Sequence, residues 1–209
     1  MLRPVFIAAA ALGFASAQTA QTSRPFSHRL HLALKLECTR CHAAAAASTR
    51  ADDNLLPDKQ ACLSCHKEVS IPSPPATQVA RFNHALHLKL GNLAPVLARA
   101  IDSKTYLSPP GETRAQLNGT NPCEACHRGL EKSDVVSPTA MPRMADCLVC
   151  HSQIDPPDSC TFCHAQTMKL KPASHTPDFL DSHTRKNAAL DKSTCAVCHG
   201  RKFTCLGCH

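Results

Sequence analysis

The cysteines of this 209-residue chain occur only as pairs separated by two residues, and a histidine directly follows each pair. Seven such Cys-x-x-Cys-His motifs use all 14 cysteines and seven of the 13 histidines. In chain order, the cysteine pairs of motifs one to seven are Cys38 and Cys41, Cys62 and Cys65, Cys123 and Cys126, Cys147 and Cys150, Cys160 and Cys163, Cys195 and Cys198, and Cys205 and Cys208. The histidines that end these motifs are His42, His66, His127, His151, His164, His199 and His209.

This spacing is typical of the covalent attachment of c-type haem. Residues three and four apart lie on one face of a helical turn, so both thiols can form thioethers with the two vinyl groups of one porphyrin. The histidine that follows can then bind the iron as an axial ligand. We therefore predict seven haem c cofactors, with every cysteine bound to a porphyrin and each motif histidine bound to an iron.

Other cysteine-based sites leave the histidines unexplained. A zinc site made of four cysteines has no use for a histidine after every second cysteine. Seven disulfides, which would be ordinary in an exported chain, give the seven histidines no role either. A thioredoxin-like redox motif would occur once, in a strand–helix–strand setting. The sevenfold repetition favours haem over all three.

Six histidines lie outside the motifs: His28, His31, His84, His87, His175 and His183. Four of them belong to a repeat, Phe-x-His-x-x-His-Leu, at residues 26–32 and 82–88. The two histidines of each copy are three apart and share one helical face, so we predict that they bind iron as axial ligands. The phenylalanine of each copy can pack on a porphyrin. His175 and His183 lack the repeat and are either further iron ligands or ordinary surface histidines.

Six further histidines cannot supply a second axial ligand to seven irons. The remaining iron can take the thioether of a methionine, and Met141, Met144 and Met168 flank haem motifs. A methionine ligand would raise the potential of that haem. Alternatively, this iron stays open, or it takes a histidine from another subunit, which implies an oligomer or a filament.

The composition predicts a chain without an ordinary core. Leu, Ile, Val and Phe make up just under a fifth of the residues, Trp is absent, and Pro outnumbers Gly by 16 to 7. A chain so poor in apolar side chains has difficulty burying a core of its own. We expect haems to form the core, wrapped by a mainly irregular chain with short α-helices and almost no β-strand. Residues 93–101 are expected to form one such helix, with Pro95 near its start.

The first 17 residues have the pattern of a secretory signal peptide. Arg3 is followed by an apolar run at 5–14 and by the small-x-small sequence Ala15-Ser16-Ala17. We expect an exported bacterial protein, periplasmic or extracellular, because no other stretch approaches the length of a transmembrane helix. The net charge of +7 is a poor guide to partners, since each haem adds two propionates. Nucleic-acid binding therefore has no support in this sequence.

After the signal peptide, the motifs divide the chain into three modules. We predict a di-haem module at 18–76, a tri-haem module at 77–168 and a C-terminal di-haem module at 169–209. The second contains a haem-free insert at 91–122, which either covers a haem face or docks a partner. The three modules are expected to form one continuous haem stack, because each is too small to fold alone.

The order of the Phe-x-His-x-x-His and Cys-x-x-Cys-His motifs resembles class III multihaem cytochromes, the cytochrome c3 and c7 group. The resemblance covers His28, His31 and residues 38–66, and then His84, His87 and residues 123–164. It implies that the two spaced histidines bind different haems and that the irons are bis-histidinyl with low potential. Two features depart from that group: Ala43 follows the first motif where a second histidine is frequent, and seven haems exceed its three or four.

Two functions are compatible with these motifs. The first is an electron carrier without enzymatic activity, which exchanges electrons with redox partner proteins through its haems. The second is a reductase of a small oxyanion or nitrogen oxide at one open iron. A reductase would need acid, base or cationic groups beside that iron. The sequence has no Cys-x-x-Cys-Lys variant and only Tyr106 as a candidate phenol, so the electron carrier is favoured.

Overall fold

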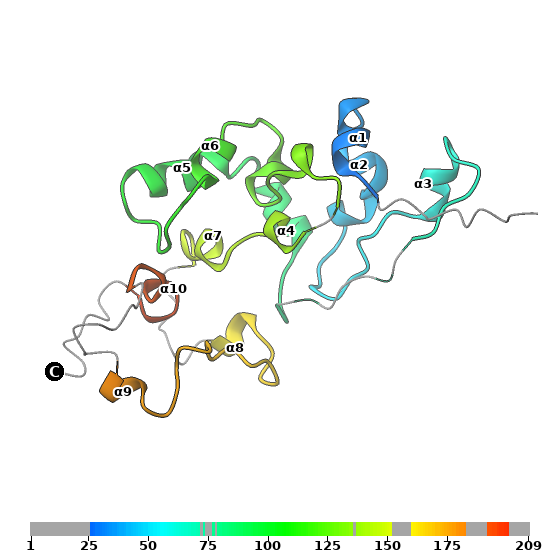
Figure 1. Cartoon of the computed structure of the whole chain (residues 1–209). Coiled ribbons are helices and arrows are strands. Elements are labelled where there is room, and N and C mark those ends of the chain that lie inside the picture. The colour runs from blue at the N-terminus through cyan, green and yellow to red at the C-terminus, as the bar shows by residue number, and fades with distance from the viewer. Residues whose placement is uncertain are drawn as a thin grey trace, which may run out of the picture.

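The computed structural model describes residues 26–71, 73, 77, 79–135, 137–151, 160–182 and 192–200. Within these ranges the chain forms short helices joined by long irregular segments, and no strand is present (Figure 1). The expected fold class, mainly irregular with short helices, is thereby confirmed. The α-helices are α1 (His28–Ala33), α2 (Cys38–Cys41), α3 (Lys59–Leu63), α4 (His84–Lys89), α5 (Ala94–Asp102), α6 (Thr113–Gln116), α7 (Met144–Leu148), α8 (Cys160–Cys163), α9 (Phe179–Ser182) and α10 (Ala196–His199). The 3-10 helices are η1 (Ala43–Ala46), η2 (Pro122–Ala125), η3 (Leu130–Lys132), η4 (Pro138–Ala140) and η5 (Lys192–Thr194).

Some of the predicted features lie outside the described residues. They are the signal peptide, His183 and the whole seventh motif, Cys205, Cys208 and His209. No helix in the described part of the chain is long and apolar enough to cross a membrane.

The two Phe-x-His-x-x-His copies start their helices in the same way. The residue between Phe and the first His is the N-cap: the side-chain oxygen of Ser27 accepts from the backbone N–H of Leu30, and that of Asn83 accepts from Leu86. Such caps satisfy N–H groups that have no partner within the helix. After α4, Gly91 has φ +78°, a left-handed conformation that ends helices and that glycine adopts without strain.

Each described Cys-x-x-Cys-His motif forms one helical turn. In all six, the backbone N–H of the histidine donates to the carbonyl of the first cysteine, at 2.8 to 3.0 Å. This i to i+4 hydrogen bond is the unit of an α-helix, and it brings both thiols and the imidazole onto one turn. The local geometry that haem attachment needs is therefore built into the backbone of every described motif.

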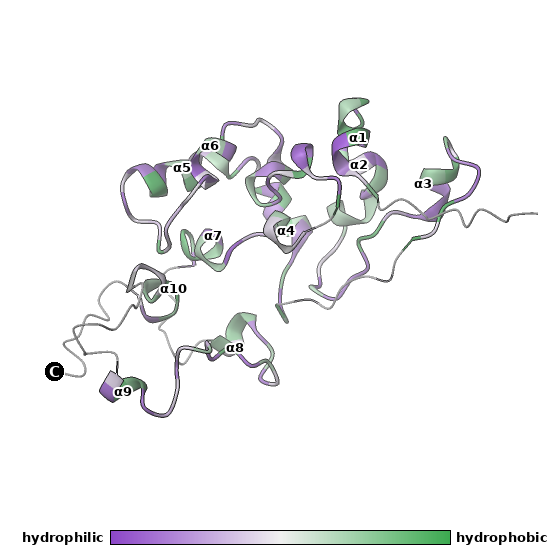
Figure 2. Ribbon diagram, viewed as in Figure 1, coloured by the Kyte–Doolittle hydropathy of each residue, from purple (hydrophilic) through white to green (hydrophobic). Residues whose placement is uncertain are grey.

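The aliphatic core of the described chain lies in the haem-free insert. Helix α5 begins with Pro95 in its first turn, one residue later than predicted, and buries Ala94, Leu97, Ala98 and Ala100. Leu97 packs with Leu117 and with Ala125 of motif three. A second cluster joins Ala100 and Tyr106 to Ala145, with Val197 of α10 against it. Figure 2 shows that α5 carries both hydrophobic and hydrophilic residues, as a helix with one buried face must.

Backbone hydrogen bonds join segments that are far apart in the sequence. Arg29 of α1 donates to the carbonyl of Ser133 at 3.0 Å, and Ala85 of α4 donates to that of Ser48 at 2.9 Å. These contacts cross the boundary predicted near residue 76, as neighbours in one continuous stack would. The three-module division itself stays a prediction.

Replacing Leu97 with Ala tests whether the insert holds the fold through its small core. Leu97 is 4 % exposed, and a cavity at a buried leucine costs about 2–4 kcal/mol of the free energy of unfolding. Denaturant unfolding followed by far-ultraviolet circular dichroism measures the loss. The matched control is Val96→Ala on the same helix, where 45 % exposure predicts a change within about 0.5 kcal/mol. Equal effects of the two substitutions would contradict this account of the core.

Candidate haem sites

Four of the histidines outside the motifs each face a motif histidine. The members of each pair come from different segments. The ring centres are 6.3 Å apart for His28 and His42, 6.1 Å for His31 and His66, 6.3 Å for His87 and His151, and 6.0 Å for His175 and His199. The ring planes of these pairs are inclined by 13°, 46°, 45° and 7°, in the same order.

These separations leave room for one metal ion between the two rings. An imidazole nitrogen binds a first-row metal at about 2.0–2.1 Å, and the ring centre lies about 1.1 Å behind it, so two rings on opposite sides of one ion have centres about 6.2–6.4 Å apart. Rings that pack directly in this structure are closer: Phe26 and His31 are 4.5 Å apart. The four pairs therefore fit the two axial positions of a haem iron.

His84, the remaining histidine of the two Phe-x-His-x-x-His copies, lies near His127 of motif three. The two histidines are close enough to interact electrostatically. Burial, followed by the neighbouring His127, lowers the pKa of His84. Burial also lowers the pKa of His28 and of His127. Because the neutral imidazole is the form that binds a metal, the surroundings of these rings favour the ligand state.

Backbone carbonyls fix the orientation of four of the histidine rings. In each, Nδ1 lies within hydrogen-bond distance of a carbonyl oxygen, and an Nδ1–H donor leaves the Nε2 lone pair for the metal. These contacts join His42 to Leu55 (2.7 Å), His127 to Ala140 (3.2 Å), His31 to Ser27 (2.8 Å) and His87 to Asn83 (2.8 Å). The Nδ1 atoms of His28 and His84 are buried with no hydrogen-bond partner among the described residues.

Phenylalanines pack against the histidine rings of the repeat, and their expected packing on porphyrin stays a prediction. Phe26 stacks on His31, and Phe82 stacks on His87, each at 4.5 Å. The edge contacts to the first histidine of each copy are 4.9 and 4.6 Å. The two copies thus have one geometry, in which a single aromatic ring positions both histidines.

His175 has a phenylalanine that the sequence reasoning missed. Phe179 of α9 stacks on His175 at 4.7 Å with the ring planes inclined by 6°. The signal was present in the sequence as His-x-x-x-Phe, but the aromatic residue follows the histidine instead of preceding it.

Apolar side chains lie exposed beside the histidines of the repeat. Leu30 and Leu86 occupy the same position in the two copies of the repeat and are 56 % and 57 % exposed. A cavity of about 700 Å³ also lies beside α4, with Phe82 and Leu86 facing Phe162 of motif five and Arg50 and Arg81 at the same walls. Asp52 also lines the cavity and pairs with Arg50 at 2.6 Å. The apolar walls beside Arg81 suit a porphyrin with anionic propionates.

Thiols of different motifs lie close enough to one another to interact electrostatically. None of the twelve cysteines in the described ranges is in a disulfide. Neighbouring thiols interact electrostatically, and burial, with Cys38 beside it, raises the pKa of Cys123. The neighbouring cysteines are Cys38 and Cys123, Cys126 and Cys147, Cys147 and Cys163, and Cys160 and Cys198. Motifs one, three, four, five and six therefore form a continuous series.

The methionines proposed for the remaining iron have no such pairing. Met141 and Met144 are 53 % and 39 % exposed, and Met168 is half-buried. A thioether ligand from any of the three stays a prediction, as does a role for His183.

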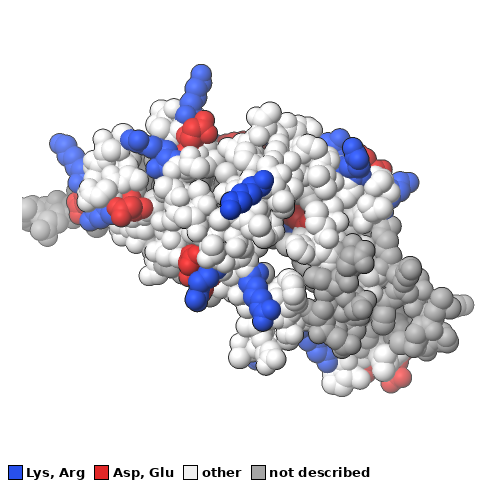
Figure 3. Space-filling view, turned by 180° about the vertical axis from the view of Figure 1, so that it is seen from behind, with Lys and Arg blue, Asp and Glu red and all other residues white. Residues whose placement is uncertain are grey.

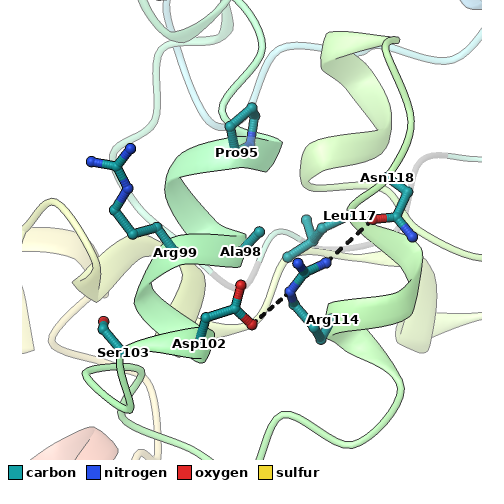
Figure 4. Close-up of a pocket in the computed structure, with 8 residues that line it drawn as sticks. All are labelled: Pro95, Ala98, Arg99, Asp102, Ser103, Arg114, Leu117 and Asn118. Atoms are coloured by element: carbon teal, nitrogen blue, oxygen red, sulfur yellow. Dashed lines mark hydrogen bonds and ion pairs between the residues drawn. The ribbon is translucent and has the colours of Figure 1, made fainter.

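Two further features of the described chain are its surface charges and a pocket in the insert. On the face seen in Figure 3, acidic and basic side chains are interspersed over the part of the chain that the structure describes. The insert has a shallow pocket of about 520 Å³, in which Arg114 pairs with Asp102 at 2.8 Å and also bonds Asn118 (Figure 4).

Taken together, the helical motif turns and the paired histidines define a multihaem c-type cytochrome. The family model described as outer membrane cytochrome MtrC/MtrF-like, domains II/IV, matches residues 32–209, and the chain belongs to this family. Membership makes haem c its cofactor and electron transfer its activity. No curated protein and no solved structure matches the chain.

The family match supports the coarser part of the expected relationship and not its finer part. The motifs resemble class III cytochromes, but the family that matches is the MtrC/MtrF-like one. The coarser identification, a multihaem c-type cytochrome, holds. The short motifs are common to several haem families, which is why they did not distinguish between these two.

Asp134 anchors α1, the helix that carries His28 and His31. Ser27 donates to Asp134 Oδ1 at 2.7 Å, and Arg29 donates to both of its oxygens at 2.9 and 3.0 Å. These bonds hold the pKa of Asp134 below its ordinary value. The folded state therefore gains stability from the ionised group above about pH 3.9 and loses it as the pH falls through the lower, folded pKa.

We predict that Asp134→Ala speeds amide hydrogen exchange in α1 at neutral pH, because the tether to the segment after η3 is lost. Hydrogen exchange read by mass spectrometry on the 26–34 region measures it. Asp52→Ala, which removes an exposed partner of Arg50, is the control and should leave α1 unchanged. Equal protection of α1 in Asp134→Ala and the natural chain would show that the tether has no such role.

Proposed function

We propose that this chain is an exported electron carrier with seven haem c groups, most of them bis-histidinyl and of low potential. The observation that carries the proposal is the set of four histidine pairs, each separated by the space of one metal ion. The periplasm or the cell exterior is the proposed location, and redox proteins are the proposed partners. The family description as an outer membrane cytochrome supports an outer-surface role.

The four ring pairs, together with the proximity of His84 to His127, support a ligand assignment for five haems, numbered by their motifs. His28 serves haem one, His31 serves haem two, His84 serves haem three, His87 serves haem four and His175 serves haem six. An iron with two protein ligands has no free position for a substrate, so these haems pass electrons without converting a small molecule. Haems five and seven remain without an assigned second ligand: His183 can serve one of them, and the other takes a methionine, takes a histidine of another subunit or stays open.

Each haem, when bound, supplies a reversible one-electron change between ferric and ferrous iron. The chain sets the energy of that change through its ligands. Carbonyl acceptors at Nδ1 make the imidazole a stronger electron donor, as at His42 through Leu55 and at His87 through Asn83. Stronger donation stabilises ferric iron, which supports the low potentials proposed here.

The helices of the repeat bring successive haems together. His28 and His31 are one helical turn apart in α1, so haems one and two lie side by side, and His84 and His87 do the same for haems three and four. Together with the neighbouring thiols, this supports an electron route through haems two, one, three, four, five and six. In Figure 1, α3 of motif two and α10 of motif six stand at opposite sides of the described chain.

The proposal predicts seven covalently bound haems in the mature protein. Intact-mass measurement, together with a pyridine haemochrome assay, should give seven haems per chain, because every cysteine pair is followed by its histidine. Replacing Cys195 and Cys198 with alanine should lower the count to six. A natural chain with unmodified cysteines would contradict the proposal.

A second prediction tests the assignment of His87 to haem four. His87→Ala should turn about one haem in seven from low-spin to high-spin in the ferric protein, because an imidazole ligand is lost. The reduced variant should bind one more carbon monoxide per chain than the natural protein. Lys89→Ala, at an exposed position of the same helix, is the control. Identical electron paramagnetic resonance spectra for His87→Ala and the control would exclude His87 as a ligand.

A further inference from the structure

A buried ion pair links the third and fourth haem motifs. Arg128 directly follows His127 of motif three, and Asp146 directly precedes Cys147 of motif four. Their side chains are 5 % and 3 % exposed and meet with 2.5 Å between Nη2 and Oδ2. The other three ion pairs of the described residues have side chains that are 42 % to 70 % exposed.

The haem-free insert completes this contact. Tyr106, the only tyrosine of the chain, is 6 % exposed and donates its hydroxyl to Asp146 Oδ1 at 2.9 Å. The backbone N–H of Arg143 donates to Asp146 Oδ2 at 2.7 Å, and Arg128 also donates to the carbonyl of Ala125 at 2.5 Å. The carboxylate therefore has three donors, which come from motif three, the insert and the segment before motif four.

Stability alone does not account for such a pair. Taking two charges out of water costs as much as their attraction returns, and apolar residues of similar size often serve as well. The pair does, however, cancel the charge of Arg128 with that of Asp146 beside two haem motifs. In a poorly solvated interior, one uncompensated charge acts strongly on groups nearby.

We propose that Arg128 and Asp146, held by Tyr106, form a charge-compensated strut in which the carboxylate cancels the buried Arg128 charge, so that this cation does not raise the reduction potentials of haems three and four. The inference rests on the proposed haem attachment at motifs three and four. All three side chains are positioning residues, because they act on the haems through charge and packing without binding iron. The strut also gives the insert a role: it supplies the tyrosine that fixes the carboxylate between the two motifs.

The signs of the expected shifts follow from charge. Reduction of a ferric haem adds one electron, so a positive charge nearby favours the ferrous state and raises the potential. Asp146→Asn leaves the Arg128 cation uncompensated and should raise the potentials of two haems. The double variant Asp146→Asn with Arg128→Met removes both charges and should bring those potentials back toward the natural values.

The experiment is a spectroelectrochemical titration of the haem-loaded variants at neutral pH. Mass measurement and low-spin absorption first establish that seven haems are present. Asp102→Asn is the matched control, because it also leaves an arginine, Arg114, without its partner, but at an exposed position of the insert. Solvent screens that charge, so the control should titrate like the natural protein.

An upward shift in Asp146→Asn that the double variant reverses supports the proposal. An unchanged titration of Asp146→Asn, or an equal shift in the double variant, overturns it while leaving the haem-carrier function intact. A natural chain without haem would instead overturn the proposed function.

If Asp146→Asn fails to take up seven haems, the potentials of Tyr106→Phe test the proposal instead. This substitution leaves the carboxylate less well compensated and should lower the same potentials, whereas unchanged potentials overturn the proposal.

Discussion

The structure depends on pairs of imidazole rings that meet across the space of one metal ion. Each pair joins segments distant in the sequence, such as His31 of α1 and His66 after α3, with ring centres 6.1 Å apart. The aliphatic core of the described chain is small and consists largely of alanines. Burial of apolar side chains, the usual source of stability, is therefore limited here. In the proposed function, iron–histidine bonds and porphyrin burial would take its place and would hold the irregular segments of the described chain in a defined arrangement.

The need to place haem-binding side chains also explains why the helices are short. A motif needs only one helical turn to place two thiols and an imidazole, so the helices are short and need no long hydrophobic face. The Phe-x-His-x-x-His helices place two histidines one turn apart, and in the proposed function these two ligands would bring two irons together. The N-caps at Ser27 and Asn83 and the stacked phenylalanines fix those helices at their first turn. The insert differs from both, because it packs motif three against motif four and supplies Tyr106.

Much of this was predictable from the sequence, because it depends on local spacing. The motif turns, the two ligand helices, the helix near residues 93–101 and the scarcity of strands all follow from residues a few positions apart. The pairing of a given histidine with a given motif was not predictable, since His31 faces His66 and not His42, which is closer to it in the sequence. The Arg128–Asp146–Tyr106 contact was also missed, because its members lie beside motifs or in the insert and share no spacing pattern. The family match supports only the coarser part of the expected relationship, because short motifs do not encode the arrangement of the haems.

The most direct test is an experimental structure of the haem-loaded protein, with iron positions located by anomalous scattering. The account predicts an iron midway between the rings of His28 and His42, His31 and His66, His87 and His151, and His175 and His199. It also predicts that haem one lies between haems two and three. Irons bound by the motif histidines while His28, His31, His87 and His175 point elsewhere would contradict it.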